Sequence, residues 1–234
     1  MSHGVTSEKK GSRSVVTFGD IIYVDTRNVN MYFSNMNKGE QTDGRHQRAE
    51  KNREAIVVAM VDLIRETGEV PTPEVIAERA GVSRRTVFRL FDDLEGLRAA
   101  VTNHLRQQVV TRFPAPIPSG RGLHEKVAAL VDHRAKIYEF VTPYRRLADS
   151  LQRSQPAVAA GLAEGRKALR MHLEWLLGEH VEPHDQERWH ALELVTSWPT
   201  WRALREDQHC SVVMAKRILR DLVERICGQS PPRR

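Results

Sequence analysis

The side chains with the clearest chemistry form a short basic segment before the middle of the chain. Residues 79–91 contain no acid but four arginines, which are Arg79, Arg84, Arg85 and Arg89. A guanidinium group donates paired hydrogen bonds to a phosphate or to the edge of a guanine. Ser83 and Thr86 add hydroxyl groups to the same segment. On charge alone a solvated helix face would explain the arginines, so their meaning depends on the elements that hold them.

Two helices, of which the second is short, are expected before the basic residues. Apolar side chains at helical spacing predict the first one, and they are Ile56, Ala59, Met60, Leu63 and Ile64. Gly68 is well placed to end this helix. Thr72 and Pro73 then suit the N-cap and the first position of a second helix. The apolar face of that second helix consists of Val75, Ile76 and Ala80.

Gly81 separates the second helix from the basic one. A residue without Cβ adopts the left-handed conformation of a sharp turn at little cost, and Ser83 can cap a third helix over residues 84–90. Val87 and Phe91 lie four apart and would face the core. The side chains left on the outward face are Arg84, Arg85, Thr86 and Arg89. Asp93 can cap a fourth helix, whose apolar repeat is Leu97, Val101 and Leu105.

Two short helices joined by a turn that contains glycine form a known DNA-reading unit. The second helix of such a unit enters the major groove, where its N-terminal side chains reach the base edges. Contacts with bases or phosphates are therefore expected from Ser83, Arg84, Arg85, Thr86 and Arg89. The backbone amides at Thr72 suit a phosphate. Basic residues at the start of the first helix can reach the flanking backbone or minor groove, namely Arg45, Arg48 and Lys51.

The four-helix context resembles the tetracycline-repressor (TetR) family over residues 48–101. The resemblance rests on the first helix ending at Gly68, and on Ile76, Ala77, residues 80–83, residues 86–89, Phe91, Glu95 and Leu97. It implies DNA contacts from the turn and the third helix. Phe88 stands where the family often has an aromatic hydroxyl, and Leu94 where it often has a lysine. Because both phosphate-binding groups are absent at these candidate contact positions, we expect Arg89 and the first helix to supply more of the backbone contact.

The remaining sequence predicts a second helical domain and an all-α fold. Residues 113–122 hold three prolines with nearby glycines, so we expect a linker between a DNA-binding domain at residues 45–112 and a helical domain at residues 123–228. Pro143 is expected to interrupt or restart a helix. The helices expected in the second domain cover residues 123–140, 144–152, 156–177, 187–204 and 211–227.

Composition sets the class of protein. The chain has 234 residues, a net charge of +6, 40% hydrophobic and 28% charged residues, which suits a folded protein. It has neither an apolar run of membrane-span length nor a secretory signal, so a soluble cytoplasmic protein is expected. Residues 1–44 and 229–234 are expected to be a disordered arm and tail. Translation could also begin at Met31 or Met36, and the sequence does not decide this.

No pattern indicates catalysis, a metal or a cofactor. The sequence lacks a glycine-rich phosphate loop, a nucleophile elbow and a zinc-protease motif. His180 and His184 have metal-like spacing, but Pro183 lies between them and no further ligand is evident. Cys210 and Cys227 are interpreted as buried thiols in a reducing compartment, with a disulfide left open. We therefore expect no enzyme, no metal site and no cofactor.

The family resemblance implies that the second domain binds a small effector and forms a homodimer. The last two expected helices carry broad apolar faces, formed by Leu192, Val195, Trp198, Val212, Val213, Ile218, Leu219, Leu222, Val223 and Ile226. A twin could cover these faces, although a core within one chain would also explain them. Candidates for an effector pocket, each of which could equally be core or surface, are Tyr138, Tyr144, Arg145, His172, Trp175, Trp198 and Trp201.

These patterns predict a sequence-specific DNA-binding transcriptional regulator. Repression is the commoner mode of the family it resembles, with an effector that releases the protein from a roughly palindromic operator. The alternative is an architectural or non-specific DNA-binding protein without an effector. Activation stays open, and the sequence names neither the operator nor the effector.

Overall fold

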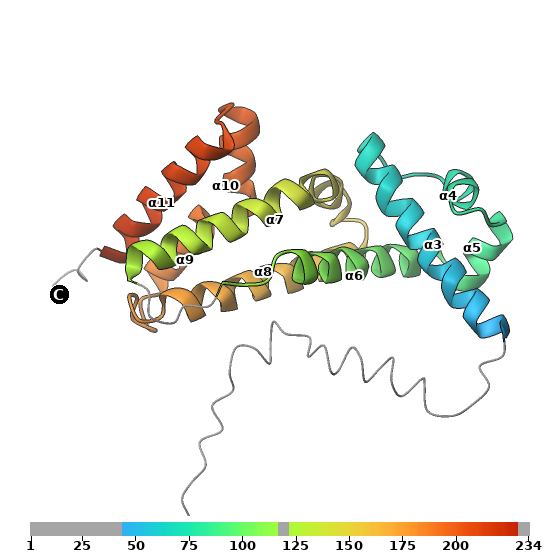
Figure 1. Cartoon of the computed structure of the whole chain (residues 1–234), viewed down its shortest axis with the longest axis horizontal. Helices are drawn as coiled ribbons and strands as arrows, with labels where there is room; N and C mark the ends of the chain where they lie inside the picture. The colour runs from blue at the N-terminus through green and yellow to red at the C-terminus, as the bar shows by residue number, and fades with distance from the viewer. Residues whose placement is uncertain (1–43, 117–121, 229–234) are drawn as a thin grey trace, which may run out of the picture. The chain divides into compact units, whose positions relative to one another are not determined.

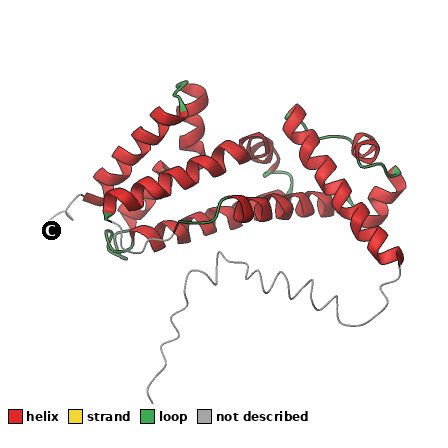
Figure 2. Ribbon diagram, viewed as in Figure 1, coloured by secondary structure: helices red, strands yellow, loops and turns green. Residues whose placement is uncertain are grey.

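The computed structural model describes residues 44–116 and 122–228, and every regular element in these two segments is a helix (Figures 1 and 2). The expected all-α fold is confirmed. The expected arm up to residue 43, the tail from residue 229 and the centre of the expected linker lie outside the described residues. The elements are α3 (Gly44–Thr67), α4 (Pro73–Arg79), α5 (Arg84–Phe91), α6 (Leu94–Arg112), α7 (Leu123–Leu151), α8 (Pro156–Leu177), α9 (Gln186–Val195), α10 (Trp198–Arg202), η1 (Ala203–Asp207) and α11 (Val212–Gly228).

Helices α3 to α6 close around one apolar core, which we call the N-terminal core. Its members come from every one of these helices and include Ile56, Ile76, Val87, Phe91 and Leu97, all buried. Three predicted caps are confirmed by hydrogen bonds to backbone N–H groups, and these caps are Thr72, Ser83 and Asp93. Local capping and an apolar stripe on each helix therefore explain this half of the fold.

A second core, the C-terminal core, lies among α7 to α11. Buried side chains from four helices meet in it, among them Leu130, Leu173, Leu192 and Leu219. Helix α6 packs against both α3 and α8, so it belongs to both halves of the chain. Tyr144 on α7 packs in the N-terminal core rather than the C-terminal one. The two cores are thus joined through α6 and the end of α7.

The predicted interruption at Pro143 is wrong, because α7 runs unbroken from Leu123 to Leu151. A proline removes one helical N–H donor and normally kinks or ends a helix. Here the residues on both sides are anchored. Tyr138 is buried in the C-terminal core and Tyr144 in the N-terminal core. Burial of both side chains offsets the missing hydrogen bond and keeps the helix continuous.

The predicted single helix over residues 187–204 is also wrong, because the chain breaks at Thr196 and Ser197. Ser197 caps a new helix by accepting a hydrogen bond from Thr200 N at 3.4 Å, and Pro199 occupies its first turn. Both features start helices and oppose the continuation of a preceding one. The π-helical turn η1 follows directly and leads into α11.

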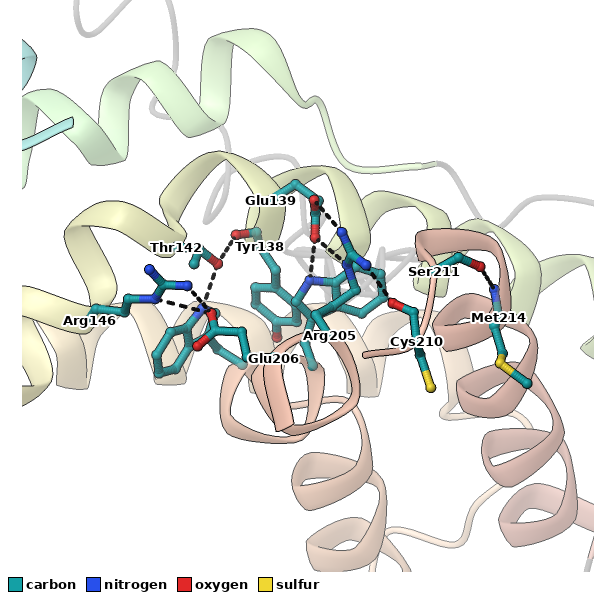
Figure 3. Close-up of polar contacts among 11 residues, drawn as sticks. Tyr138, Glu139, Thr142, Arg146, Arg205, Glu206, Cys210, Ser211 and Met214 are labelled. Carbon is teal, nitrogen blue, oxygen red and sulfur yellow. Dashed lines mark hydrogen bonds and ion pairs between the residues drawn. The ribbon is translucent and has the colours of Figure 1, made fainter. Parts of the chain in front are cut away.

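Side chains from α7 hold this irregular segment in place (Figure 3). Glu139 accepts hydrogen bonds from Trp201 Nε1 at 2.9 Å and from Arg205 Nε at 3.0 Å. Arg205 also donates to the backbone oxygen of Cys210 at 2.5 Å. Farther along, Arg146 donates to Glu206 at 2.6 Å. The break that the sequence did not reveal is therefore fixed by polar contacts from a distant helix.

No helix in the described ranges is both long enough and apolar enough to cross a membrane. Both cysteines are buried and carry free thiols, as expected. Burial raises the pKa of the Cys227 thiol to about 11, so this side chain is protonated at neutral pH.

Candidate nucleic-acid interface

The turn between α4 and α5 has the geometry that its glycine predicts. Gly81 has a φ of 66°, in the left-handed region. Gly81 N donates to Glu78 O at 3.1 Å, and Val82 N donates to Ala77 O at 3.0 Å. This pair of hydrogen bonds is the Schellman motif, which satisfies the last carbonyls of a helix. The turn therefore fixes the direction in which α5 leaves α4.

Helix α5 begins at a cap that uses both of its hydroxyl groups. Ser83 Oγ accepts a hydrogen bond from Thr86 N at 3.2 Å and lies 2.9 Å from Thr86 Oγ1. On the inward side, Val87 and Phe91 are buried in the N-terminal core. The predicted outward side chains of Arg84, Arg85 and Arg89 are exposed, whereas Thr86 is half-buried. Anchoring one face in this way leaves the arginines at the surface.

Two of the four arginines in the basic segment are paired with acids from other helices. Arg84 Nε lies 2.9 Å from Glu74 on α4, and its guanidinium carbon lies 5.4 Å from the centre of the Phe88 ring. Arg79 binds Glu66 on α3 with both guanidinium ends, at 3.0 and 2.8 Å. This hydrogen bonding lowers the pKa of Glu66. The segment is acid-free along the sequence but not in space.

Arg85 and Arg89 differ from these paired arginines. Both are exposed, and they lie four residues apart, so they share one side of α5. Within the described residues neither makes a hydrogen bond or an ion pair. They can therefore bind an incoming phosphate or base edge without first breaking a contact.

The expected phosphate site at Thr72 is partly used by the protein itself. The Thr72 hydroxyl accepts a hydrogen bond from Val75 N at 3.5 Å. A hydrogen bond from its own backbone N–H is the main factor that lowers the pKa of Glu74, which also bonds to the Thr72 side chain. A phosphate at this helix end would compete with the Glu74 carboxylate. Arg45 and Arg48, at the start of α3, are exposed as expected.

Sequence reasoning missed Arg53 on α3, which ties two helices together. Its Nη1 donates to Leu90 O, near the end of α5, at 2.5 Å. Its guanidinium carbon lies 4.3 Å from the centre of the Phe91 ring. The signal was present, because Arg53 precedes Ile56 by three residues and so falls on the apolar stripe of its helix. A charge on a buried stripe indicates a partner across the core.

Comparisons with known proteins address the fold. No family model matches the sequence, and no curated protein matches it significantly. A transcriptional regulator from Rhodococcus sp. Rha1 superposes with a TM-score of 0.60 at 17% identity, over 74% of this chain and 95% of its own. A TetR-family transcriptional regulator from Streptomyces coelicolor superposes with a TM-score of 0.57 at 19% identity, over 74% of this chain and 80% of its own. This chain has the TetR fold. At such low identity the likeness concerns architecture, so the side chains must be judged on their own contacts.

The effector candidates of this TetR fold meet in separate contacts. The Arg145 guanidinium carbon lies 5.1 Å from the centre of the Trp198 ring, and the rings of Tyr138 and Trp201 have centres 6.4 Å apart. Tyr144 lies in the N-terminal core, and Arg145 pairs with Asp149 at 3.0 Å. Trp198 Nε1 donates to Thr142 Oγ1 at 3.1 Å, and Trp201 is held by Glu139 in the same region (Figure 3). These aromatic side chains are anchored parts of the α7–α10 contact.

Three other candidates lie nearer one another, with two partners that the sequence did not suggest. His172 on α8 contacts Trp175, with ring centres 6.1 Å apart, and it contacts His133 on α7 at 4.9 Å. Next to His133 along α7, Arg134 is buried and donates to the backbone oxygen of Thr196 at 2.7 Å. Tyr138 donates to that same oxygen at 2.7 Å. The sequence suggested Tyr138, His172 and Trp175 as pocket candidates, but it could not show which polar groups meet beside them.

Of the apolar side chains predicted for dimerisation, four are partly buried against the C-terminal core, namely Val195, Val212, Ile218 and Ile226. The others divide into two sets. Leu192, Trp198, Leu219 and Val223 are buried in the C-terminal core of the same chain. Val213 is 77% exposed and Leu222 is 37% exposed, both on α11. Two further apolar side chains near this face are exposed as well, Leu194 on α9 and Met214 on α11. Only the second set is available to a partner.

Proposed function

We propose that this protein is a sequence-specific DNA-binding transcriptional regulator that works in the cytoplasm. The observation that carries the proposal is the α4–α5 unit, in which a Schellman turn at Gly81 presents Arg85 and Arg89 without partners among the described residues. Helix α5 is short and amphipathic, with one face locked in the N-terminal core. A helix of this kind, held by a preceding short helix, suits insertion into the major groove.

The arginines of α5 are assigned different tasks. Arg85 and Arg89 bind phosphates or guanine edges directly, since no existing contact opposes this. Arg84 is held by Glu74, so it reaches DNA only in exchange for that ion pair. Ser83 and Thr86 contribute hydroxyl groups near the start of the helix, and Arg45 and Arg48 reach the flanking backbone. Phe88 stacks with Arg84 and acts as its support.

The protein is proposed to act as a homodimer through the exposed face of α11 and its neighbour α9. Met214 and Leu222 are exposed on α11 on either side of the partly buried Ile218, and Leu194 is 68% exposed on α9, which packs against α11. An exposed apolar stripe of this kind is expected to be covered by a second copy. Two-fold symmetry then requires a roughly palindromic operator. Leu222→Glu should convert the dimer to a monomer in analytical ultracentrifugation, whereas an unchanged mass would contradict this interface.

The proposed mode is repression relieved by a small effector that binds among α7, α8 and the following segment. Helix α6 packs on α3 at one end and on α8 at the other, so it can carry a change between the two cores. An architectural DNA-binding protein would need no such coupling and would not prefer a particular site.

The test is a binding measurement on genomic fragments with excess competitor DNA. A regulator retains a discrete complex with a specific fragment, whereas an architectural protein shows only salt-labile binding that any DNA competes away. Arg89→Ala should weaken the specific complex about tenfold and lower its salt slope by about 1, as expected for one lost phosphate contact. Arg166→Ala, an exposed arginine on α8, is the matched control. Equal affinities and slopes for both variants would contradict the assignment of Arg89.

A further inference from the structure

We infer that the interior between α7 and α8 holds a binding site for a small carboxylate, whose anionic group is received by Arg134 and His172. Both side chains are almost completely buried, at 3% and 2% exposure. Both carry polar atoms that have no hydrogen-bond partner among the described residues. The further statement that this carboxylate regulates DNA binding rests on the function proposed above, whereas the binding site itself does not.

Arg134 is a buried cation without an anionic partner in the described ranges. Its guanidinium donates to neutral groups only, the Thr196 backbone oxygen at 2.7 Å, Thr196 Oγ1 at 2.5 Å and Leu169 O at 2.7 Å. The Nε atom of Arg134 is left without a partner. Arginine stays protonated in proteins, so an uncompensated charge is held in the interior.

The nearby acids of α7 are already engaged elsewhere. Asp132 pairs with Lys216 at 2.7 Å and with Arg220 at 2.6 Å, both on α11. Glu139 binds Arg205, as Figure 3 shows, and it also accepts a hydrogen bond from Trp201 Nε1. Neither acid is therefore left to neutralise Arg134. An external anion would supply the missing charge.

His172 provides the second half of the site. Neither of its ring nitrogens has a hydrogen-bond partner in the described structure. A neutral imidazole always carries one N–H, so one donor is buried here without an acceptor. Burial of an unsatisfied polar group costs free energy, and such groups in native proteins call for an explanation. A carboxylate oxygen that accepts from His172 would remove this cost.

His133 and the pKa of His172 define the charge of the site. His133 Nε2 lies 2.9 Å from Phe113 O, which can only accept, so the ring donates there and its Nδ1 is left without a partner. Burial, followed by the proximity of His133 and Arg134, lowers the pKa of His172 to about 3. The imidazole is thus neutral at pH 7, and Arg134 is the single formal charge in the cluster. One buried cation matches a monocarboxylate better than a phosphate dianion.

Neighbouring side chains define the rest of the ligand. Trp175 and the partly buried Leu169 flank the cluster on α8, and Leu173 is fully buried beside it. Phe113, whose backbone oxygen binds His133, packs its ring against Phe140 with ring centres 5.7 Å apart. These apolar side chains suit an aromatic or aliphatic tail. The ligand class is therefore a carboxylate with one apolar end.

The position of the site gives it a route to the DNA-binding helices. His133 binds the backbone oxygen of Phe113, the residue that ends α6. Helix α6 packs against α3 in the N-terminal core. A ligand that moves His133 or separates α7 from α8 would therefore shift the end of α6.

The experiment titrates the full chain, free of DNA, with sodium benzoate and sodium octanoate, and with benzamide and octanamide as neutral counterparts. Calorimetry and the unfolding midpoint are measured for the wild type, His172→Leu and Arg134→Lys. The carboxylates should bind and raise the midpoint, and the amides should do neither. His172→Leu should weaken carboxylate binding at least tenfold, and Arg134→Lys should retain part of it. His190→Leu, at an exposed histidine on α9, should behave as wild type.

The unliganded variant gives a second, independent readout. Because His172 makes no hydrogen bond, a similar-sized apolar side chain should raise the unfolding midpoint of the free protein. A lower midpoint would show that the imidazole is structural and would overturn the proposal. So would equal binding of carboxylates and amides, equal binding by wild type and His172→Leu, or no binding of either carboxylate by the wild type.

DNA binding separates this inference from the proposed function. If benzoate or octanoate binds at Arg134 and His172 and also releases a specific DNA complex, the carboxylate site and its regulatory role are both supported. If it binds without affecting the complex, the carboxylate site stands and its regulatory role fails. If the free protein forms no specific DNA complex at all, the proposed function fails, while the calorimetric result still decides the site.

Discussion

The two cores of this protein differ in where they place their polar chemistry. Around the N-terminal core, the starts of α4, α5 and α6 are capped locally, and among the described residues only the Tyr144 hydroxyl and Arg98 Nε are buried there without a partner. Around the C-terminal core, Arg134, His133 and His172 keep buried atoms unpartnered. The first region presents its arginines on the surface and uses its apolar interior as a rigid support. The second places its chemistry inside, where unmet hydrogen bonds mark a place for something else to bind.

The largest expected effect is a pH dependence of folding stability that arises from His172. Its pKa falls from the usual 6.5 to about 3, chiefly through burial. The unfolded chain therefore binds more protons between these values, and folding stability decreases as the pH falls through that window. In His172→Leu this contribution disappears, so the variant should gain about 3 kcal/mol relative to wild type between pH 7 and pH 4. Denaturant unfolding at both pH values measures this gain. If the difference in unfolding free energy between the variant and the wild type were the same at pH 7 and pH 4, His172 would not be a buried neutral histidine.

The next effect probes the rigid support at Gly81. A side chain there would meet no atom within 4 Å, so a substitution acts through the backbone alone. Gly81→Val forces a β-branched residue into the left-handed region and should cost about 2 kcal/mol of stability together with specific DNA binding.

Gly81→Asn is the matched control, because asparagine adopts this conformation more readily. It should keep most of the stability and affinity. Equal losses for the two variants, measured by unfolding and by DNA titration, would show that the turn does not act through its left-handed geometry.

The smallest effect concerns the cap of α5. Ser83→Ala removes the acceptor for Thr86 N and should cost about 1 kcal/mol. Ser150→Ala, which removes an exposed hydroxyl within α7, should stay within a few tenths of a kcal/mol. Thermal unfolding of the two variants compares them directly. If Ser150→Ala were the more damaging change, local capping would not be what supports the N-terminal helices.

The difference between local and long-range contacts explains how much of the fold and of the candidate site could be predicted from the sequence. The caps at Thr72, Ser83 and Asp93 and the turn at Gly81 depend on neighbours within a few residues, so local patterns were sufficient. The pairing of Arg84 with Glu74 links two different helices. That contact exists only in the folded chain. The absence of acids from residues 79–91 therefore did not reveal that Arg84 is paired.

In the C-terminal half the decisive contacts span longer distances. Pro143 was expected to break its helix, but burial of Tyr138 and Tyr144 on either side keeps it intact. Arg134 meets Thr196, which lies 62 residues later in the chain. The sequence suggested His172 and Tyr138 as effector-pocket candidates, but it could not show that the ring nitrogens of His172 would be left unpartnered.

The central claim is that α5 reads a specific DNA sequence, and a selection from a randomised double-stranded DNA library tests it most directly. The purified full chain is carried through several rounds of binding with competitor DNA, and the retained molecules are sequenced. We predict enrichment of one motif with approximate two-fold symmetry, and loss of that enrichment in Arg85→Ala and Arg89→Ala. Retention of DNA without any enriched motif, in wild type and variants alike, would contradict the account.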